Sequence, residues 1–186
     1  MTFKDITKED AKIFIKKFVN HKNNKSPELR FMEHITKSGI KTFSTPYNVS
    51  WEITAGCNLR CKHCCFAKES YNEKNDVPTN IAIDFANQLV DNDLVKIMLT
   101  GGEPFLRKDL FDIISTLKRN NAIIELTTNA TLINEDNAKK LSELFNPLYD
   151  FVQVSLDGAT AQTHEKTRGK NTFQKTIEGI KLLIKN

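Results

Sequence analysis

All four cysteines of the chain lie within the stretch TAGCNLRCKHCCFA, residues 54–67. They are too close together to join distant loops, so a shared role as a thiol cluster explains their placement better than disulfides do. In a cytosolic protein, clustered cysteines more often bind metal or carry out redox work than form disulfides. The spacing Cys57-x-x-x-Cys61-x-x-Cys64 puts three thiols in one loop, where they can converge on one inorganic centre.

The spacing alone leaves several inorganic centres open. Structural zinc normally takes four ligands in two separated pairs, and no second pair of cysteines exists here. On a cubane iron–sulfur cluster, three cysteines would leave one iron without a protein ligand and open to chemistry. A ferredoxin-type cluster uses a fourth cysteine, which could be Cys65. A zinc site or an electron-transfer cluster in a non-catalytic binding module is therefore one alternative.

The elements that must position these thiols alternate along the chain. Apolar, β-rich segments predict strands, and amphipathic segments with helical spacing predict the helices between them. Four strand–helix units in series predict an α/β protein with a parallel sheet or barrel, and the spacing does not decide between the two. The predicted strands are 48–54, 95–100, 122–128 and 151–158. The first predicted helix starts at the N-cap Thr79 and has the apolar face Ala82, Phe85, Ala86 and Leu89, and the second starts at the N-cap Asp109 and has the face Leu110, Ile113, Ile114 and Leu117. The third covers 133–145 with the face Ala138, Leu141 and Phe145. The fourth covers 171–186 with the face Phe173, Ile177, Ile180 and Ile184.

Unusual residues follow the predicted strand ends. The cysteines follow the first strand, GGEP (101–104) the second and TTNAT (127–131) the third, while SLDG (155–158) lies at the end of the fourth. Parallel α/β folds build their active sites at the carboxyl ends of the strands. No G-x-G-x-x-G follows the first strand, which argues against a dinucleotide-binding sheet.

Three motifs together resemble the radical S-adenosylmethionine (radical SAM) superfamily. They are CNLRCKHC, GGEP and the stretch VQVSLDGATAQTHEKTRGKNTFQKTIEGIKLL, and the similarity covers residues 48–185. The last stretch resembles the branch of peptide and protein maturases (SPASM-like), anaerobic sulfatase maturases and molybdenum-cofactor cyclases. The resemblance implies a partial (β/α)6 barrel, present here through its fourth unit. We therefore expect the chain to be C-terminally truncated, with its activity alone an open question.

The resemblance also implies a reaction and its cofactors. In the family, S-adenosylmethionine binds the open iron of a 4Fe–4S cluster, and an electron from the reduced cluster cleaves it to methionine and a 5′-deoxyadenosyl radical that abstracts hydrogen. Cys57, Cys61 and Cys64 would be the cluster ligands. A peptide or protein is the expected substrate, a small-molecule cofactor-pathway enzyme is the alternative, and an electron donor such as ferredoxin or flavodoxin is implied. No side chain is assigned as catalytic.

The GGEP motif is expected to contact S-adenosylmethionine. Gly101 and Gly102 lack a Cβ, so their backbone can approach a ligand closely or adopt positive φ. The resemblance assigns their carbonyls to the ligand's ammonium group. Glu103 would support this site, and Pro104 would stiffen the exit of the motif.

Five later residues complete the expected cofactor site. The resemblance assigns Ser155 to the ribose and Arg168 to the carboxylate of S-adenosylmethionine, whose shape a guanidinium fits well. Thr128 and Asn129 resemble a TNG motif in which Ala130 replaces the usual glycine. Asp157 fits either the cofactor site or a turn before Gly158. Four further residues are expected to be structural: His63 in the place of an aromatic side chain, Cys65 as a small buried residue, Trp51 in the core and His164 on a helix surface.

Composition and charge limit the other functions. Residues 1–46 are expected to form an N-terminal helical segment that could dock a peptide, and residues 47–186 the catalytic core. No apolar run approaches the roughly 20 residues of a membrane helix, and the charged N-terminus does not resemble a signal peptide, so we expect a cytoplasmic protein. The net charge of +4 comes from scattered lysines, which makes nucleic acid an unlikely partner.

Overall fold

The computed structural model describes residues 46–65, 74, 76–92 and 94–186. The helical segment expected over residues 1–46 lies outside the described residues, except for Pro46. The division at residue 46 therefore stays a prediction, as does the docking role of that segment.

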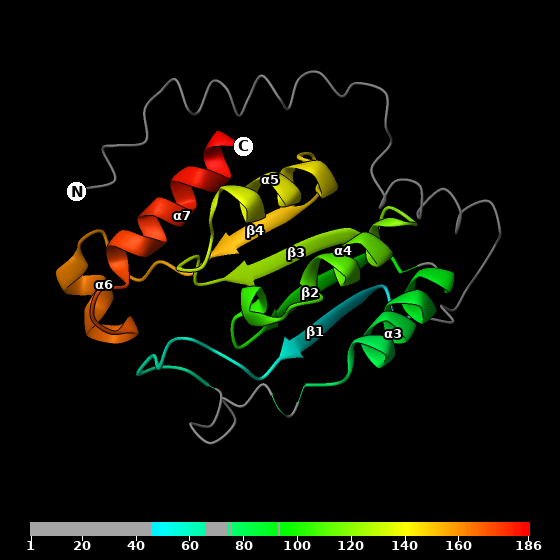
Figure 1. Cartoon of the computed structure of the whole chain (residues 1–186), viewed down its shortest axis with the longest axis horizontal. Coiled ribbons are helices and arrows are strands. Elements are labelled where there is room, and N and C mark those ends of the chain that lie inside the picture. Colours follow the sequence, from blue (N-terminus) through cyan, green and yellow to red (C-terminus); the bar gives the residue numbers. More distant parts are fainter. Residues whose placement is uncertain (1–45, 66–73, 75, 93) are drawn as a thin grey trace.

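Four parallel strands form one sheet in the order of the sequence, β1-β2-β3-β4. All four arrowheads point to the same side in Figure 1, so the segments that follow the strands gather at one edge of the sheet. This confirms the predicted α/β class with parallel strands. The strands are β1 (Asn48–Thr54), β2 (Lys96–Gly101), β3 (Ile123–Thr128) and β4 (Phe151–Val154).

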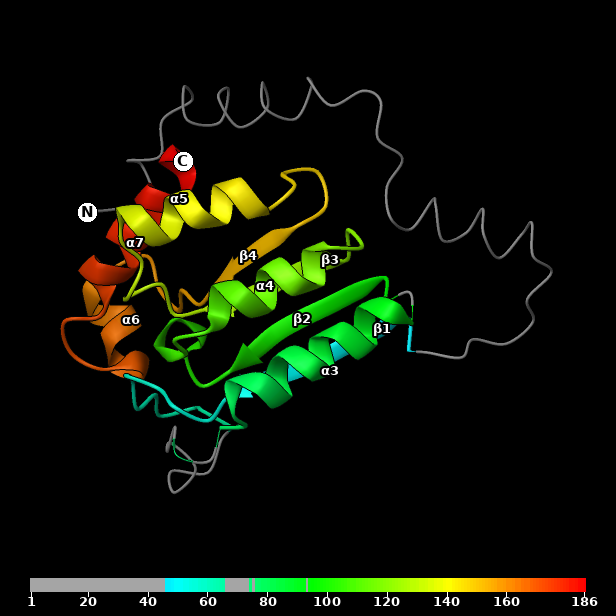
Figure 2. The same cartoon turned by 45° about the vertical axis from the view of Figure 1, so that its right-hand side comes forward.

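Helices α3, α4 and α5 lie along one face of the sheet, as Figure 2 shows. Each follows the strand before it, which is the connection that parallel strands require. A short 3-10 helix, η4, intervenes after β2, and two helices follow β4. The helices are α3 (Thr79–Asp91), η4 (Pro104–Leu106), α4 (Leu110–Lys118), α5 (Glu135–Leu144), α6 (Ala161–Arg168) and α7 (Phe173–Lys185).

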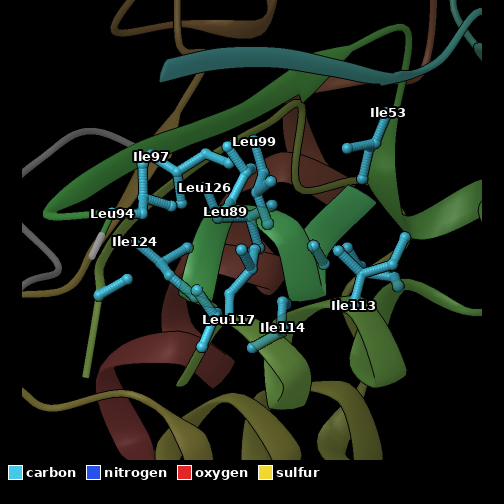
Figure 3. Packing of buried hydrophobic residues seen from close by; sticks show 14 of the residues in the cluster. Ile53, Leu89, Leu94, Ile97, Leu99, Ile113, Ile114, Leu117, Ile124 and Leu126 are labelled. Carbon is cyan, nitrogen blue, oxygen red and sulfur yellow. The ribbon is translucent and has the colours of Figure 1, made fainter. Parts of the chain in front are cut away.

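The hydrophobic core lies between the sheet and these helices (Figure 3). Alternate strand residues such as Leu99 and Leu126 are fully buried and meet the predicted faces of α3 and α4. Burial of each such side chain contributes about 1.5–3 kcal/mol. The opposite face of the sheet carries side chains such as Glu52 and Gln153, which are exposed in the described part of the chain. The sheet therefore has one covered and one open face.

Several expected elements need correction. The fourth strand ends at Val154, not at residue 158, because the chain turns there toward α6. Pro78, not Thr79, is the N-cap of α3. Phe85 is not buried: it is 38% exposed and stacks edge-on against Trp51 with ring centroids 4.9 Å apart. Trp51 packs, half-buried, against the core, as expected.

The face of α7 differs from the predicted one. Phe173 is buried as expected, but the other fully buried residues of this helix are Thr176 and Gly179. A Cβ on Gly179 would lie 2.2 Å from the carbonyl oxygen of Ala130, so the helix comes unusually close to the turn after β3. The isoleucines of the predicted stripe lie half-buried beside this contact, at 177, 180 and 184.

A helix was expected around His164, but its bounds and the burial of His164 were not predicted. Thr160 caps α6 through a reciprocal capping box with Thr163. His164 was expected on the helix surface, but it is 0% exposed and packs edge-on against Phe173. Its Nδ1 accepts the backbone N–H of Asp157 at 3.3 Å, so the helix turns this side chain inward beneath the SLDG turn. No helix among the described residues is both long and apolar enough to cross a membrane.

Candidate functional site

The cysteine loop leaves the end of β1 and approaches α6 at the carboxyl edge of the sheet (Figure 1). Cys57, Cys61 and Cys64 are free thiols and partly buried, and the N–H of Cys64 donates to the carbonyl of Cys61 at 3.2 Å. Cys65 was expected to be buried but is exposed. Cys65 directly follows the turn that the hydrogen bond between Cys64 and Cys61 closes, and it differs from the three expected ligands in its exposure.

The thiols influence one another electrostatically. Burial raises the pKa of Cys57; a hydrogen bond from the N–H of Leu59 opposes this, and the charges of Glu103 and Cys61 add to it. Burial also raises the pKa of Cys61, with Arg168 opposing and Cys64 adding. A thiol must lose its proton to bind a metal, so binding here would release protons.

The donor set fits an iron–sulfur cluster. Three thiols in one partly buried loop supply the soft ligands that iron–sulfur clusters require. No group of three His, Cys, Asp or Glu side chains in the described residues surrounds a single-ion position. A cubane does not need such a position, because each cysteine ligand binds a different iron. Cys57, Cys61 and Cys64 would hold the cluster, and a hydrogen bond of 3.4 Å from the N–H of Leu59 to Sγ of Cys57 would act on its potential.

The two glycines of GGEP lie directly against the cysteine loop. A Cβ on Gly101 would lie 2.4 Å from the carbonyl oxygen of Thr54, and one on Gly102 would lie 2.0 Å from that of Gly56. Gly101 also has φ +119°, a conformation that side chains disfavour. The N–H of Gly102 donates to Thr54 at 2.8 Å, and that of Glu103 donates to Gly56 at 2.8 Å. The protein's own backbone thus requires glycine here, in addition to the ligand contact that the motif predicts.

Glu103 joins the second strand end to the third. Its side chain is 0% exposed. One carboxylate oxygen accepts the hydroxyl of Thr128 at 2.7 Å and the N–H of Phe105 at 3.2 Å, and the other accepts the N–H of Asn129 at 2.8 Å. Burial raises the pKa of Glu103, and these three donors oppose the rise. Its role in the described chain is to hold two turns together, while Pro104 is buried at the start of η4.

The turn after β3 reaches the cysteine loop. The side-chain amide of Asn129 donates to Oδ1 of Asn58 at 2.9 Å, and that of Asn58 donates to the hydroxyl of Thr131 at 2.8 Å. Ala130 adopts φ +59°, the left-handed conformation that glycine would take without strain. Its N–H donates to the hydroxyl of Thr128 at 2.9 Å. The substitution of alanine for glycine therefore leaves the left-handed turn in place.

Asp157 and Arg168 form a bidentate pair beside the cysteines. Nε of Arg168 lies 2.7 Å from Oδ2 of Asp157, and a second guanidinium nitrogen donates to Oδ1 at 3.1 Å. A third nitrogen lies 4.0 Å from Sγ of Cys61. Burial would raise the pKa of Asp157, but hydrogen bonds and charge from Arg168, with smaller contributions from His63 and His164, hold it below its ordinary value. Asp157 is thus more than a turn residue.

Arg168 was expected to pair with the carboxylate of S-adenosylmethionine. In this structure one edge of its guanidinium is paired with Asp157. The pairing with S-adenosylmethionine therefore stays a prediction, and only the remaining N–H donors of Arg168 are available for it. Ser155 directly follows β4, and its N–H donates to the carbonyl of Thr128 at 2.9 Å. His63 is half-exposed, with Nε2 3.6 Å from Asp157.

The structure brings all the predicted site segments to one edge of the sheet, linked by the contacts described above. It also includes residues that the sequence did not point to. Asn58 lies inside the cysteine motif, so its position was a usable signal. Asp76 and Arg107 gave none, because the backbone groups that they bond at the base of the cysteine loop lie 21 or more residues away in the sequence.

Comparisons with known proteins agree with this geometry. Residues 51–186 match the family described as the Radical SAM superfamily. An AdoMet-dependent heme synthase from Methanosarcina barkeri is 34% identical over 147 residues, which are 78% of this chain and 41% of that protein. The subtilosin biosynthesis protein AlbA from Bacillus subtilis is 30% identical over 150 residues, covering 80% of this chain and 33% of that protein.

Solved structures share the fold. The structure described as native anSMEcpe with bound AdoMet superposes with a TM-score of 0.61 at 27% identity, covering 74% of this chain and 40% of that one. The same protein has also been solved with AdoMet and a peptide. The chain therefore spans between a third and about two fifths of the length of these relatives.

Proposed function

The chain belongs to the Radical SAM superfamily, and from this premise we propose that it is the cluster-binding core of an enzyme that modifies a peptide or protein. The observation that supports the proposal best is the meeting of the cysteine loop with GGEP and the turns after β3 and β4 at one sheet edge. When bound, a 4Fe–4S cluster and S-adenosylmethionine supply a 5′-deoxyadenosyl radical for hydrogen abstraction.

The chain's own residues have separable roles in this proposal. Cys57, Cys61 and Cys64 hold the cluster. Gly101 and Gly102 bring the end of β2 against the loop and offer backbone groups to S-adenosylmethionine. Thr128, Asn129 and Ser155, which lie at the carboxyl ends of β3 and β4, would support the rest of that ligand.

Anaerobic reconstitution tests the core of this proposal. The chain would be loaded with iron and sulfide, reduced with dithionite and incubated with S-adenosylmethionine, and 5′-deoxyadenosine would be measured by mass spectrometry. We expect the product with the unaltered chain and with Cys65→Ala, and none with Cys61→Ala. Equal loss of the cluster in both variants would contradict the assignment of three ligands.

The peptide substrate rests on the relatives. AlbA is a bacteriocin biosynthesis protein, and anSMEcpe has been solved with a bound peptide. The heme synthase favours a second candidate, the modification of a small molecule such as a tetrapyrrole. The protein, supplied with a carbon-deuterated peptide pool or with a deuterated iron porphyrin, would distinguish the two: only the true substrate class transfers deuterium into 5′-deoxyadenosine. A low-potential donor such as ferredoxin or flavodoxin is the proposed source of the electron.

A further inference from the structure

The base of the cysteine loop is closed by a carboxylate from the far end of the same connection. Oδ2 of Asp76 accepts the hydroxyl of Thr54 at 2.5 Å, and Oδ1 accepts the N–H of Ala55 at 2.7 Å. The hydroxyl of Thr54 in turn accepts the N–H of Gly56 at 2.9 Å. Thr54 is 3% exposed, so these hydrogen bonds are largely shielded from water. The three residues that precede Cys57 are thereby fixed.

A buried guanidinium, that of Arg107, also bonds to the two ends of the cysteine loop. Arg107, 8% exposed, donates to the carbonyl of Ile53 at 2.6 Å and to that of Val77 at 3.0 Å. One of its side-chain nitrogens, Nε, lies 2.7 Å from Oδ1 of Asp109, and another donates to Oδ2 at 3.0 Å. Arg107 therefore connects the residue before the loop to a residue after it, while Asp109 fixes its orientation.

Arg107 is tied to the glycine motif. Arg107 is the C-cap of η4, which begins at Pro104, so the exit of GGEP delivers the guanidinium to the loop. Burial would raise the pKa of Asp109, but hydrogen bonds from Thr79 and Arg107 and the charge of Arg107 outweigh it and hold the pKa below its ordinary value. The charge that orients Arg107 is thus present at neutral pH.

We propose that Asp76 and Arg107 are positioning residues that hold the cysteine loop in its cluster-binding geometry before the cluster arrives. This inference rests on the proposed function. Groups that orient metal ligands typically affect metal affinity by about 10- to 100-fold when they are removed. Neither side chain reaches a cysteine itself in the contacts above: both act on the backbone at the base of the loop.

The test compares variants that differ in what they can bond. Asp76→Ala removes both acceptors. Asp76→Asn keeps the hydrogen bond from Ala55 through its amide oxygen, and its NH₂ can donate to the hydroxyl of Thr54, which reverses the direction of that hydrogen bond. Arg107→Lys keeps the charge opposite Asp109 but lacks the fork that spans two carbonyls. Matched controls are Asp84→Ala and Arg119→Lys, at exposed positions on or near the outer helices.

The measurements are iron and sulfide content after anaerobic reconstitution, the rate of iron release to a chelator, and the thermal unfolding of the metal-free chain. We expect Asp76→Ala to release iron at least about 10-fold faster than Asp84→Ala, with Asp76→Asn close to the unaltered chain. Arg107→Lys should release iron faster than Arg119→Lys, with the metal-free fold retained in both.

The outcomes separate the two proposals. If the unaltered chain takes up no cluster, the proposed function fails. If it takes up a cluster and all variants release iron at one rate, the positioning role of Asp76 and Arg107 is wrong. If Asp76→Ala unfolds without metal, its iron release cannot be compared and Arg107→Lys decides. Faster iron release by Arg107→Lys than by Arg119→Lys supports the proposal, and release at the rate of Arg119→Lys overturns it.

Discussion

Single side chains around Cys61 set its electrostatic environment. Arg168, whose side chain is 12% exposed, brings a positive charge to within 4.0 Å of Sγ of Cys61 and is held there by Asp157. A cation beside a cluster ligand favours the reduced, more negative cluster. The pair of residues therefore acts on the potential at which an electron can enter.

Replacing Arg168 by Gln should lower the midpoint potential of the bound cluster. Loss of one charge worth about 1 kcal/mol at this partly screened site corresponds to a shift of about 40–60 mV for one electron. A redox titration followed by electron paramagnetic resonance measures it, with Arg119→Gln as the control. A potential equal to that of the control would show that the arginine does not act on the cluster.

The two kinds of glycine requirement can be separated by substitution. A Cβ at Gly102 would meet the carbonyl oxygen of Gly56, whereas Gly169 has φ +105° but open space around its Cβ position. We expect Gly169→Ala to cost about 1–3 kcal/mol of unfolding free energy from backbone strain alone, because φ +105° with ψ 162° is a conformation that essentially only glycine adopts. Gly102→Ala should cost about 1–3 kcal/mol and also reduce cluster loading, since it displaces the residue before Cys57. Denaturant titration and iron analysis measure the two effects, and normal loading of Gly102→Ala would contradict the steric argument.

At the scale of elements, the connections after the strands do more than join strand to helix. Each carries a polar group that bonds to a neighbouring connection: Glu103 to the turn after β3, Asn129 to the cysteine loop, and Arg107 to both ends of that loop. α6 is held to the loop by a backbone hydrogen bond of 2.9 Å from Lys62 to Thr167. A disturbance at one strand end is therefore expected to reach the cysteines.

The pH dependence of stability should reveal the pair of Arg107 and Asp109. Asp109 has a pKa below its ordinary 3.8 in the folded chain, so it stabilises the fold at pH values above 3.8. That contribution is lost as the pH falls from 3.8 through the pKa of Asp109 in the folded chain, because over this range the unfolded chain binds the proton more readily than the folded chain does. We expect Asp109→Asn to be about 3 kcal/mol less stable than the unaltered chain at neutral pH, since it leaves a buried cation unpaired. The difference should shrink below about pH 4; urea titrations across pH test this, and a difference that grows in acid would contradict it.

At the scale of the whole molecule, the sheet separates packing from chemistry. One face is covered by α3, α4 and α5 and holds the core, the other is open in the described chain, and the site lies along the carboxyl edge between them (Figure 2). The chain spans only about two fifths of the length of the heme synthase and of anSMEcpe.

Adjacent residues of β2 should differ sharply in their contribution to stability. Leu99 is 0% exposed in the core, whereas its neighbour Met98 points to the open face and is only partly buried. We expect Leu99→Ala to lower the unfolding free energy by about 2–5 kcal/mol and Met98→Ala by less than half of that. Chemical denaturation of the metal-free chain measures both values. Equal costs would mean that the open face is covered in solution.

The sequence by itself determined the fold class and the family. Strand and helix periodicities are local, and they predicted the strand β1 and the buried face of α4 correctly because a core imposes them residue by residue. The motifs after the strands predicted the family because they too are local signals: CNLRCKHC and GGEP are short and contiguous. Family membership is now shown, while the individual ligand roles of Cys57, Cys61 and Cys64 stay predictions.

Only the tertiary structure decided which distant groups meet. Asp76 contacts Thr54 across 22 positions and Arg107 contacts Ile53 across 54, and no local pattern marks such pairs. His164 was expected on a helix surface, yet the packing of α6 against Phe173 buries it. Contacts of this kind form only when pairing of the strands and packing of the helices bring the connections together. They therefore depend on interactions among residues that are far apart in the sequence.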